Sequence, residues 1–174
     1  INVHSAQNYI EFLSDDLLEG REAGTRGGEI ASLYIASILK QIGIEPLNNS
    51  YLQYFTVGKK NEKERFLFAE ESDSEQWLEI RKMRNVSGKI TGEDTTQYVI
   101  IGAHYDHLGI DSSLENDSIY NGADDNASGV SAVLQVAKAC LMTGVKPERT
   151  IIFAFWDGEE KGLRVAAMLL EILR

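Results

Sequence analysis

The sequence predicts a three-layer αβα fold of the α/β class, in which a mixed, largely parallel central sheet lies between helices. Two apolar runs carry this prediction. Residues 98–103 and 150–155 are rich in β-branched and aromatic side chains without polar alternation, as expected of strands covered on both faces. A helical pattern over residues 127–143 lies between them with short links, which is the order of a parallel crossover unit. The length suits one domain, residues 1–174.

The chain begins with a predicted helix over residues 5–18, for which Ser5 is the candidate cap. Leu17 belongs to its apolar stripe. Residues 18–27 follow and combine three glycines with several charges and no periodicity. Two interpretations of this segment stay open, a surface connector and a part of the rim of a site.

A second helix is predicted over residues 28–42, between Thr25 as its cap and Gly43 as its terminator. Aromatic residues and alternation then predict an edge strand at residues 51–57. Residues 66–68 would return beside it across a charged loop, so that the two segments form a hairpin.

Two further elements complete the expected fold. Residues 85–92 are typical of a strand that runs to a glycine turn, and we expect it to be antiparallel to the strand at residues 98–103. After the second buried strand, apolar residues at helical spacing predict a last amphipathic helix over residues 163–173.

Acids and a histidine cluster in sequence around the ends of the two buried strands. The set consists of His104, Asp106, Asp125, Glu159 and Glu160. Because ligand sites in open α/β sheets lie outside the carboxyl ends of the strands, we expect these side chains to meet in one crevice. Converging carboxylates raise one another's pKa unless a cation is present, and Zn²⁺ accepts imidazole and carboxylate ligands together. The pattern therefore predicts zinc, with two ions in a complete site.

Each short motif also has a simpler interpretation. A His-x-Asp pair at a strand end is more often a hydrogen-bonded loop, an Asp-Asp-Asn run a turn or helix cap, and a Glu-Glu pair a solvated helix start. The metal site is favoured because all three motifs follow a buried-strand signal or lie just before a helix. His104 and Asp106 are two residues apart and point the same way on extended backbone, so the acid can orient the imidazole. We interpret His107 as part of the loop structure.

Three blocks, in this order and at this spacing, resemble the zinc aminopeptidases of the M28 peptidase family. The blocks are residues 104–106 (HYD), 122–129 (GADDNASG) and 157–162 (DGEEKG). The resemblance implies a zinc-peptidase-like catalytic domain that hydrolyses the N-terminal residue from peptides with the help of two zinc ions. It identifies the partner as a peptide substrate with a free N-terminus.

The resemblance also implies a role for each residue of the set. His104 matches a ligand of one zinc, and Asp106 matches the acid that orients it. Asp125 matches the ligand that bridges the two ions, and the peptide bond after it is cis in the family. Glu160 matches a ligand of the second zinc, and Glu159 matches the general base that passes a proton to the leaving amine.

Two more ligands, an Asp and a His, are implied from segments well after the glutamate pair. Neither residue type occurs after Glu160. We therefore expect residues 1–174 to be an incomplete catalytic domain, truncated at its C-terminus and inactive or weakly active. Two alternatives stay open: a glutaminyl-cyclase-like acyltransferase on the same scaffold, and a non-catalytic fragment that forms a homo-oligomer or domain-swapped dimer through an unpaired sheet edge.

Composition narrows the range of partners. The chain carries 17 Lys and Arg against 27 Asp and Glu, a net charge of -10, which argues against binding to nucleic acid or an anionic membrane. No apolar run approaches the roughly 20 residues of a membrane-spanning helix. Because relatives with these motifs are commonly exported, the resemblance predicts a periplasmic or extracellular location.

Overall fold

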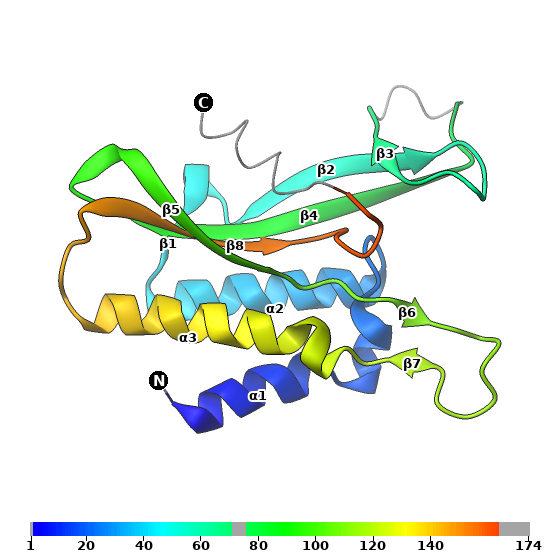
Figure 1. Ribbon diagram of the computed structural model, residues 1–174, viewed down its shortest axis with the longest axis horizontal. Coiled ribbons are helices and arrows are strands. Elements are labelled where there is room, and N and C mark those ends of the chain that lie inside the picture. The colour runs from blue at the N-terminus through cyan, green and yellow to red at the C-terminus, as the bar shows by residue number, and fades with distance from the viewer. Residues whose placement is uncertain (1, 71–75, 164–174) are drawn as a thin grey trace.

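The computed structural model describes residues 2–70 and 76–163 and shows a mixed α/β fold (Figure 1). The main sheet has the strand order β3-β2-β4-β8-β5, with β1 paired to β4. Its strands are β1 (Glu45–Pro46), β2 (Leu52–Lys59), β3 (Leu67–Phe68), β4 (Glu79–Ile90), β5 (Asp94–His104) and β8 (Arg149–Trp156). The helices are α1 (Val3–Leu13), α2 (Arg26–Ile42) and α3 (Ser128–Met142).

Shorter elements connect these pieces. They are the 3₁₀ turns η1 (Asp16–Arg21) and η2 (Leu47–Asn49), the π-helical turn η4 (Ala123–Ala127), and a small hairpin of β6 (Gly109–Ile110) and β7 (Ile119–Tyr120). None of the described helices combines the length and apolar character that a membrane crossing requires.

The sheet is mixed, as predicted, but it is not largely parallel. Of its described strand pairs, only β5 and β8 run parallel, whereas β4–β8, β2–β4, β2–β3 and β1–β4 are antiparallel. Parallel neighbours need a long crossover connection. The chain supplies one through α3, between β5 and β8, while the links among the earlier strands are too short for another.

The two apolar strands differ in burial. Phe153 and Phe155 on one face of β8 are buried, and so are Ile152 and Ala154 on the other face. In β5, by contrast, Tyr98 is 39% exposed and Val99 is 45% exposed. The prediction that both runs are covered on both faces is therefore correct only for β8. Within the described part of the sheet, β5 is also the last strand.

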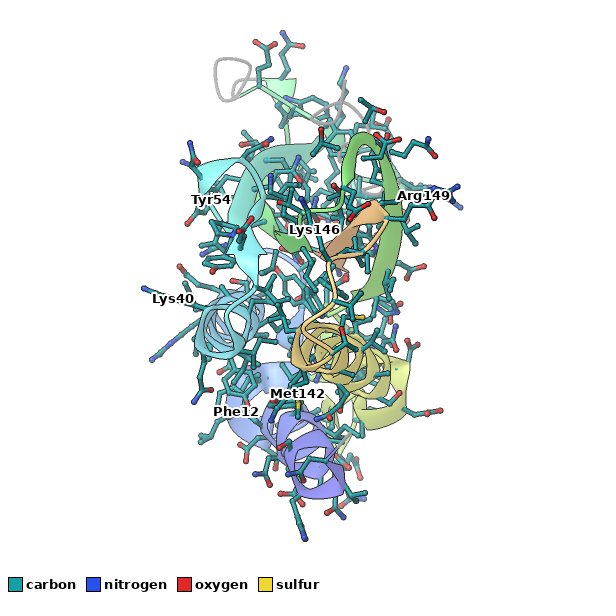
Figure 2. All side chains as sticks on the ribbon, turned by 90° about the vertical axis from the view of Figure 1, so that its left-hand side faces the viewer. Phe12, Lys40, Tyr54, Met142, Lys146 and Arg149 are labelled. Carbon is teal, nitrogen blue, oxygen red and sulfur yellow. The ribbon has the colours of Figure 1, made fainter. Side chains whose placement is uncertain are left out.

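Helices α2 and α3 cover one face of the sheet, and α1 packs beneath them on the side away from it (Figure 1). Seen from the end in Figure 2, Phe12 of α1 lies beside α2, where it stacks on Tyr34 with ring centroids 3.8 Å apart. All described α-helices thus lie on one side of the sheet. The helix predicted over residues 163–173 lies almost entirely outside the described residues.

The first two helices show how caps set element boundaries. Helix α2 begins where the Thr25 side chain accepts a hydrogen bond from the Gly28 N–H, and it ends at left-handed Gly43, as predicted. Helix α1 instead starts after Asn2 and ends at Leu13, so the predicted range of residues 5–18 was wrong. The following turn, η1, has its own N-cap at Asp15. Leu17 lies in this turn and not in α1, and its side chain is 83% exposed, so it is not part of the apolar stripe of the helix.

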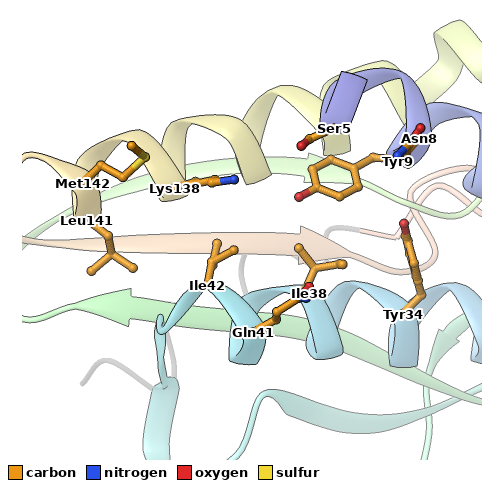
Figure 3. A pocket seen from close by; sticks show the side chains of 10 residues that line it. All are labelled: Ser5, Asn8, Tyr9, Tyr34, Ile38, Gln41, Ile42, Lys138, Leu141 and Met142. Atoms are coloured by element: carbon orange, nitrogen blue, oxygen red, sulfur yellow. The ribbon is translucent and has the colours of Figure 1, made fainter. Parts of the chain in front are cut away.

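A cavity of about 700 Å³ opens between α1, α2 and α3 (Figure 3). Its lining includes Tyr9 and Tyr34 together with Lys138 and Met142 from the C-terminal half of α3. The residues predicted to bind metal instead flank the start of α3, so this cavity is separate from the predicted site.

Candidate metal centre

The structure brings together the three predicted metal ligands. Strands β5 and β8 are parallel with His104 beside Trp156, so both strands end at the same edge of the sheet. Glu160 follows β8, and Asp125 comes from η4 just before α3. One ligand atom each of His104, Asp125 and Glu160 lies within 4.8 Å of the others.

The imidazole of His104 is oriented with one nitrogen toward the centre. Its Nδ1 lies 3.1 Å from the main-chain oxygen of Asp106, and its Nε2 lies 3.0 Å from Oδ1 of Asp125. Two ligand atoms of one tetrahedral zinc, each about 2.0–2.1 Å from the ion, are separated by roughly 3.3 Å. The His104–Asp125 pair therefore already has nearly the spacing that zinc requires, and the nitrogen and oxygen donors suit that ion.

The local charges favour a protonated His104 when no metal is bound. The Asp106 carboxylate, whose Oδ1 lies 3.7 Å from Nδ1 of His104, raises the pKa of His104 to about 9, and the nearby Glu159 adds to this while partial burial opposes it. A metal ligand must be a neutral imidazole. A cation that binds here therefore takes the place of a proton.

Asp106 makes contacts beyond the one with His104. The fully buried carboxylate accepts hydrogen bonds from the backbone N–H groups of Glu159, at 3.1 Å, and Glu160, at 3.2 Å. Its Oδ1 also lies 3.7 Å from Nδ1 of His104, while the Asp106 main-chain oxygen is the nearer neighbour of that nitrogen, at 3.1 Å. The two N–H groups, which are partly buried, thereby gain an acceptor. Asp106 thus couples the ligand on β5 to the loop after β8.

The loop that carries Asp125 is shaped by its backbone. The Asp125–Asn126 peptide bond is cis, as the family resemblance implies, and Gly122 takes a left-handed conformation at the start of the loop. The Asn126 side chain accepts a hydrogen bond from the Gly129 N–H at 3.1 Å. This anchors the loop to the first turn of α3 and leaves the Asp125 carboxylate 65% exposed toward the centre.

The two adjacent glutamates differ in their contacts. Oε1 of Glu160 lies 2.8 Å from Nδ1 of His107, and the Glu160 side chain is 17% exposed. Glu159 is exposed and, within the part of the chain that the structure describes, its carboxylate has no hydrogen-bond partner. His107 does belong to loop structure, in an isolated bridge with Glu22, but its contact with Glu160 was not foreseen.

Sequence reasoning also missed Arg21, which lies fully buried beneath the centre. Its guanidinium donates to the carbonyl oxygens of Tyr105 (2.9 Å), Asn121 (2.6 Å), Gly122 (3.0 Å) and Leu13. Tyr105 lies between His104 and Asp106, and Gly122 opens the Asp125 loop, so Arg21 ties both arms of the centre together. The glycine-rich segment of residues 18–27 is therefore more than a surface connector.

The buried charge of Arg21 has acidic neighbours. Burial lowers the pKa of Arg21 to about 10, while the charges of Asp106 and Asp125 act in the opposite direction. The acids around the centre are thus partly balanced by one cation below it. The Asp125 side chain, which is 65% exposed, lies on the open side of the centre.

Comparison with known proteins gives a family match and several partial relatives. The family model described as Peptidase family M28 matches residues 85–171. A glutamate carboxypeptidase 2 homolog of Caenorhabditis elegans is 36% identical over 91 residues, which cover 49% of this chain and 10% of that protein. A probable aminopeptidase of Saccharomyces cerevisiae is 33% identical over 101 residues, covering 56% of this chain and 26% of that protein. The chain thus spans a tenth to about a quarter of these relatives.

Solved structures share the fold. The LapA aminopeptidase of Legionella pneumophila superposes with a TM-score of 0.66 and 19% identity, over 98% of this chain and 38% of that chain. The glutaminyl cyclase of Fimbriiglobus ruber gives a TM-score of 0.67 and 20% identity, over 92% of this chain and 46% of that chain. At these identities the likeness establishes the mixed α/β fold alone. The family match and the donor set together support zinc as the ion.

Proposed function

Because the chain belongs to peptidase family M28, whose model covers half of its residues, we propose that it forms part of a zinc-dependent exopeptidase that removes the N-terminal residue of a peptide. The observation that carries this proposal is the convergence of His104, Asp125 and Glu160 at the end of two parallel strands. Three segments far apart in sequence supply one imidazole and two carboxylates, and a divalent cation is the partner that such a set suits.

His104, Asp125 and Glu160 would hold the zinc. When bound, zinc polarises a carbonyl group and makes water more acidic. In the two-ion site that the family resemblance implies, His104 would be a ligand of one ion, Glu160 of the other, and Asp125 of both. The two further ligands that the family resemblance implies do not follow Glu160 in this sequence, so we expect weak zinc binding and low activity from these 174 residues.

Glu159 is the proposed general base. Its carboxylate is exposed and free of hydrogen bonds among the residues described, while its backbone N–H is fixed by Asp106. It can therefore take a proton from the attacking water and deliver it to the leaving amine. The acidic surroundings also favour a substrate whose N-terminal ammonium carries a positive charge.

A glutaminyl-cyclase-like reaction is the second candidate, because a solved cyclase shares this fold with a TM-score of 0.67. In that reaction an N-terminal glutamine closes on itself and releases ammonia. The Asp124–Asp125 and Glu159–Glu160 pairs favour the peptidase, since two ions need more carboxylates than one. Release of ammonia from a glutaminyl peptide without peptide-bond cleavage would favour the cyclase.

The test is zinc-dependent hydrolysis of aminoacyl p-nitroanilides by the chain and by its Glu159→Gln variant. We expect slow hydrolysis that requires zinc and that falls by a factor of about 10²–10⁴ in the variant, because the base is lost. Glu11→Gln, on the exposed surface of α1, is the matched control and should keep the activity. Hydrolysis that persists in Glu159→Gln, or that is unaffected by a chelator, would contradict the proposal.

A further inference from the structure

We infer that His107 is a positioning residue that holds one carboxylate oxygen of Glu160 and so presents the other oxygen to the metal. The inference rests on the proposed function, because Glu160 is a ligand only if a metal binds. It assigns a role to a histidine that the sequence motifs leave without one.

The contact is short and shielded from solvent. Nδ1 of His107 lies 2.8 Å from Oε1 of Glu160, and the two side chains are only 11% and 17% exposed. At this distance the imidazole N–H donates to the carboxylate. A hydrogen bond from a neighbour fixes the orientation of a ligating carboxylate and reduces the freedom that metal binding must remove.

His107 can act in this way because it is itself held in place. Its backbone N–H donates to the carbonyl oxygen of Arg21 at 3.2 Å, and its ring meets the edge of Tyr120 with centroids 6.4 Å apart. The ring also lies close to Gly122, where a Cβ atom would lie 2.6 Å from Cδ2 of His107 and 2.4 Å from the Asp125 carbonyl oxygen. Only glycine at that position leaves room for the imidazole.

The contrast with Glu159 supports a division of labour. Both glutamates have their backbone N–H groups held by Asp106, so the chain fixes their main chains equally. Only the Glu160 side chain is then held a second time, by His107. A ligand benefits from a fixed carboxylate, whereas a base must move between the water and the leaving amine. His107 therefore distinguishes the ligand from the base.

The experiment measures zinc affinity by calorimetry and chelator competition in the wild type, His107→Phe and His107→Asn. Phenylalanine keeps a ring but no donor, and the amide nitrogen of asparagine stands where Nδ1 stood. We expect His107→Phe to weaken zinc binding by roughly 10- to 100-fold, as losing the partner of a ligand does. His107→Asn should stay within about threefold of the wild type. His4→Phe, on the exposed surface of α1, is the control and should not differ from the wild type.

Thermal unfolding of the metal-free variants separates this role from a structural one. The substitution His107→Phe should reduce the free energy of zinc binding by more than it reduces the free energy of unfolding of the metal-free protein. Wild-type zinc affinity in His107→Phe, or an equal loss in both His107 variants, would overturn the inference while leaving the proposed metal centre intact. If the wild type itself bound no zinc, the proposed function would fail, and the role of His107 with it.

Discussion

His104 links the electrostatics of the centre to its metal chemistry. The Asp106 carboxylate raises the pKa of His104 to about 9, so the imidazole is mainly protonated at neutral pH and pairs with Asp125. In the metal-free protein the raised pKa stabilises the fold fully below the usual histidine pKa of 6.5, and this contribution is lost as the pH rises through about 9. Metal binding reverses the preference, because only the neutral imidazole is a ligand.

Zinc uptake at pH 7 should therefore release close to one proton from His104, and the apparent affinity should fall by up to about tenfold per pH unit below 9. Calorimetric titrations in buffers of different ionisation enthalpy count the protons released. In Asp106→Asn the acid that raises the pKa is gone, so fewer protons should be released. Identical binding heats in all buffers at pH 7 would count against a protonated His104.

The roles of individual residues were only partly accessible from the sequence. Spacing and resemblance identified His104, Asp125 and Glu160 because each lies next to a buried strand or a helix start. His107 and Glu160 are in contact although they are 53 positions apart in the sequence. The backbone N–H of Glu159, which donates to the Asp106 carboxylate, is also 53 positions away from Asp106. No local pattern encodes such pairs, because they depend on how the two strand ends lie side by side.

At the level of elements, η1 acts as the support of the centre. The guanidinium of Arg21, in η1, donates hydrogen bonds to the segment after β5 and to the loop before α3. The next residue, Glu22, forms ion pairs with Arg81, at 2.8 Å, and with Lys161, at 2.5 Å. Lys161 directly follows Glu160, so one short turn fixes all three segments that carry ligands. Thr25 then caps the next helix, α2.

Replacing Arg21 by Met should destabilise the fold strongly, because several buried carbonyl oxygens lose their donor at about 1–3 kcal/mol each. Arg21→Lys should recover little, since an ammonium cannot reproduce the planar fork of the guanidinium. Urea unfolding followed by circular dichroism measures both variants. The control Arg26→Met, at an exposed position, should change the free energy of unfolding by no more than about 0.5 kcal/mol. Equal stability of the Arg21 and Arg26 variants would contradict the supporting role of η1.

Elements with strong local signals were predictable, and those set by distant partners were not. Thr25 and Gly43 define α2 through short-range hydrogen bonds that the sequence reveals. The end of α1 is decided by Asp15, which caps the next turn, and the path of η1 is decided by carbonyl groups that lie up to 101 residues away from Arg21. Resolving these needs the tertiary structure.

For the molecule as a whole, the described sheet ends at β5. This strand pairs with β8 on one side and, among the strands described, has no neighbour on the other. Tyr98 and Val99 are partly exposed there. An open strand edge with apolar side chains is a template for pairing with another chain. The sequence suggested a mixed sheet but not this arrangement, because the strand order depends on β8 being inserted between β4 and β5.

We therefore expect this polypeptide to self-associate in a concentration-dependent way. Light scattering coupled to size-exclusion chromatography should show a mass above that of the monomer as the concentration rises. Val99→Lys places a charge on the open edge and should shift the protein toward the monomer. Val3→Lys, which changes an exposed apolar residue on α1, is the matched control. A monomer mass for the wild type over a wide concentration range would contradict the expectation.

Zinc affinity, measured by calorimetry across a set of single variants, tests the metal centre most directly. The wild type should bind zinc, and His104→Ala, Asp125→Ala and Glu160→Ala should each weaken binding by roughly tenfold or more, because each removes a ligand. His4→Ala should leave the affinity unchanged. Wild-type zinc affinity in each of the three single ligand variants would contradict a metal centre at the ends of β5 and β8. A wild type that binds no zinc would contradict it as well.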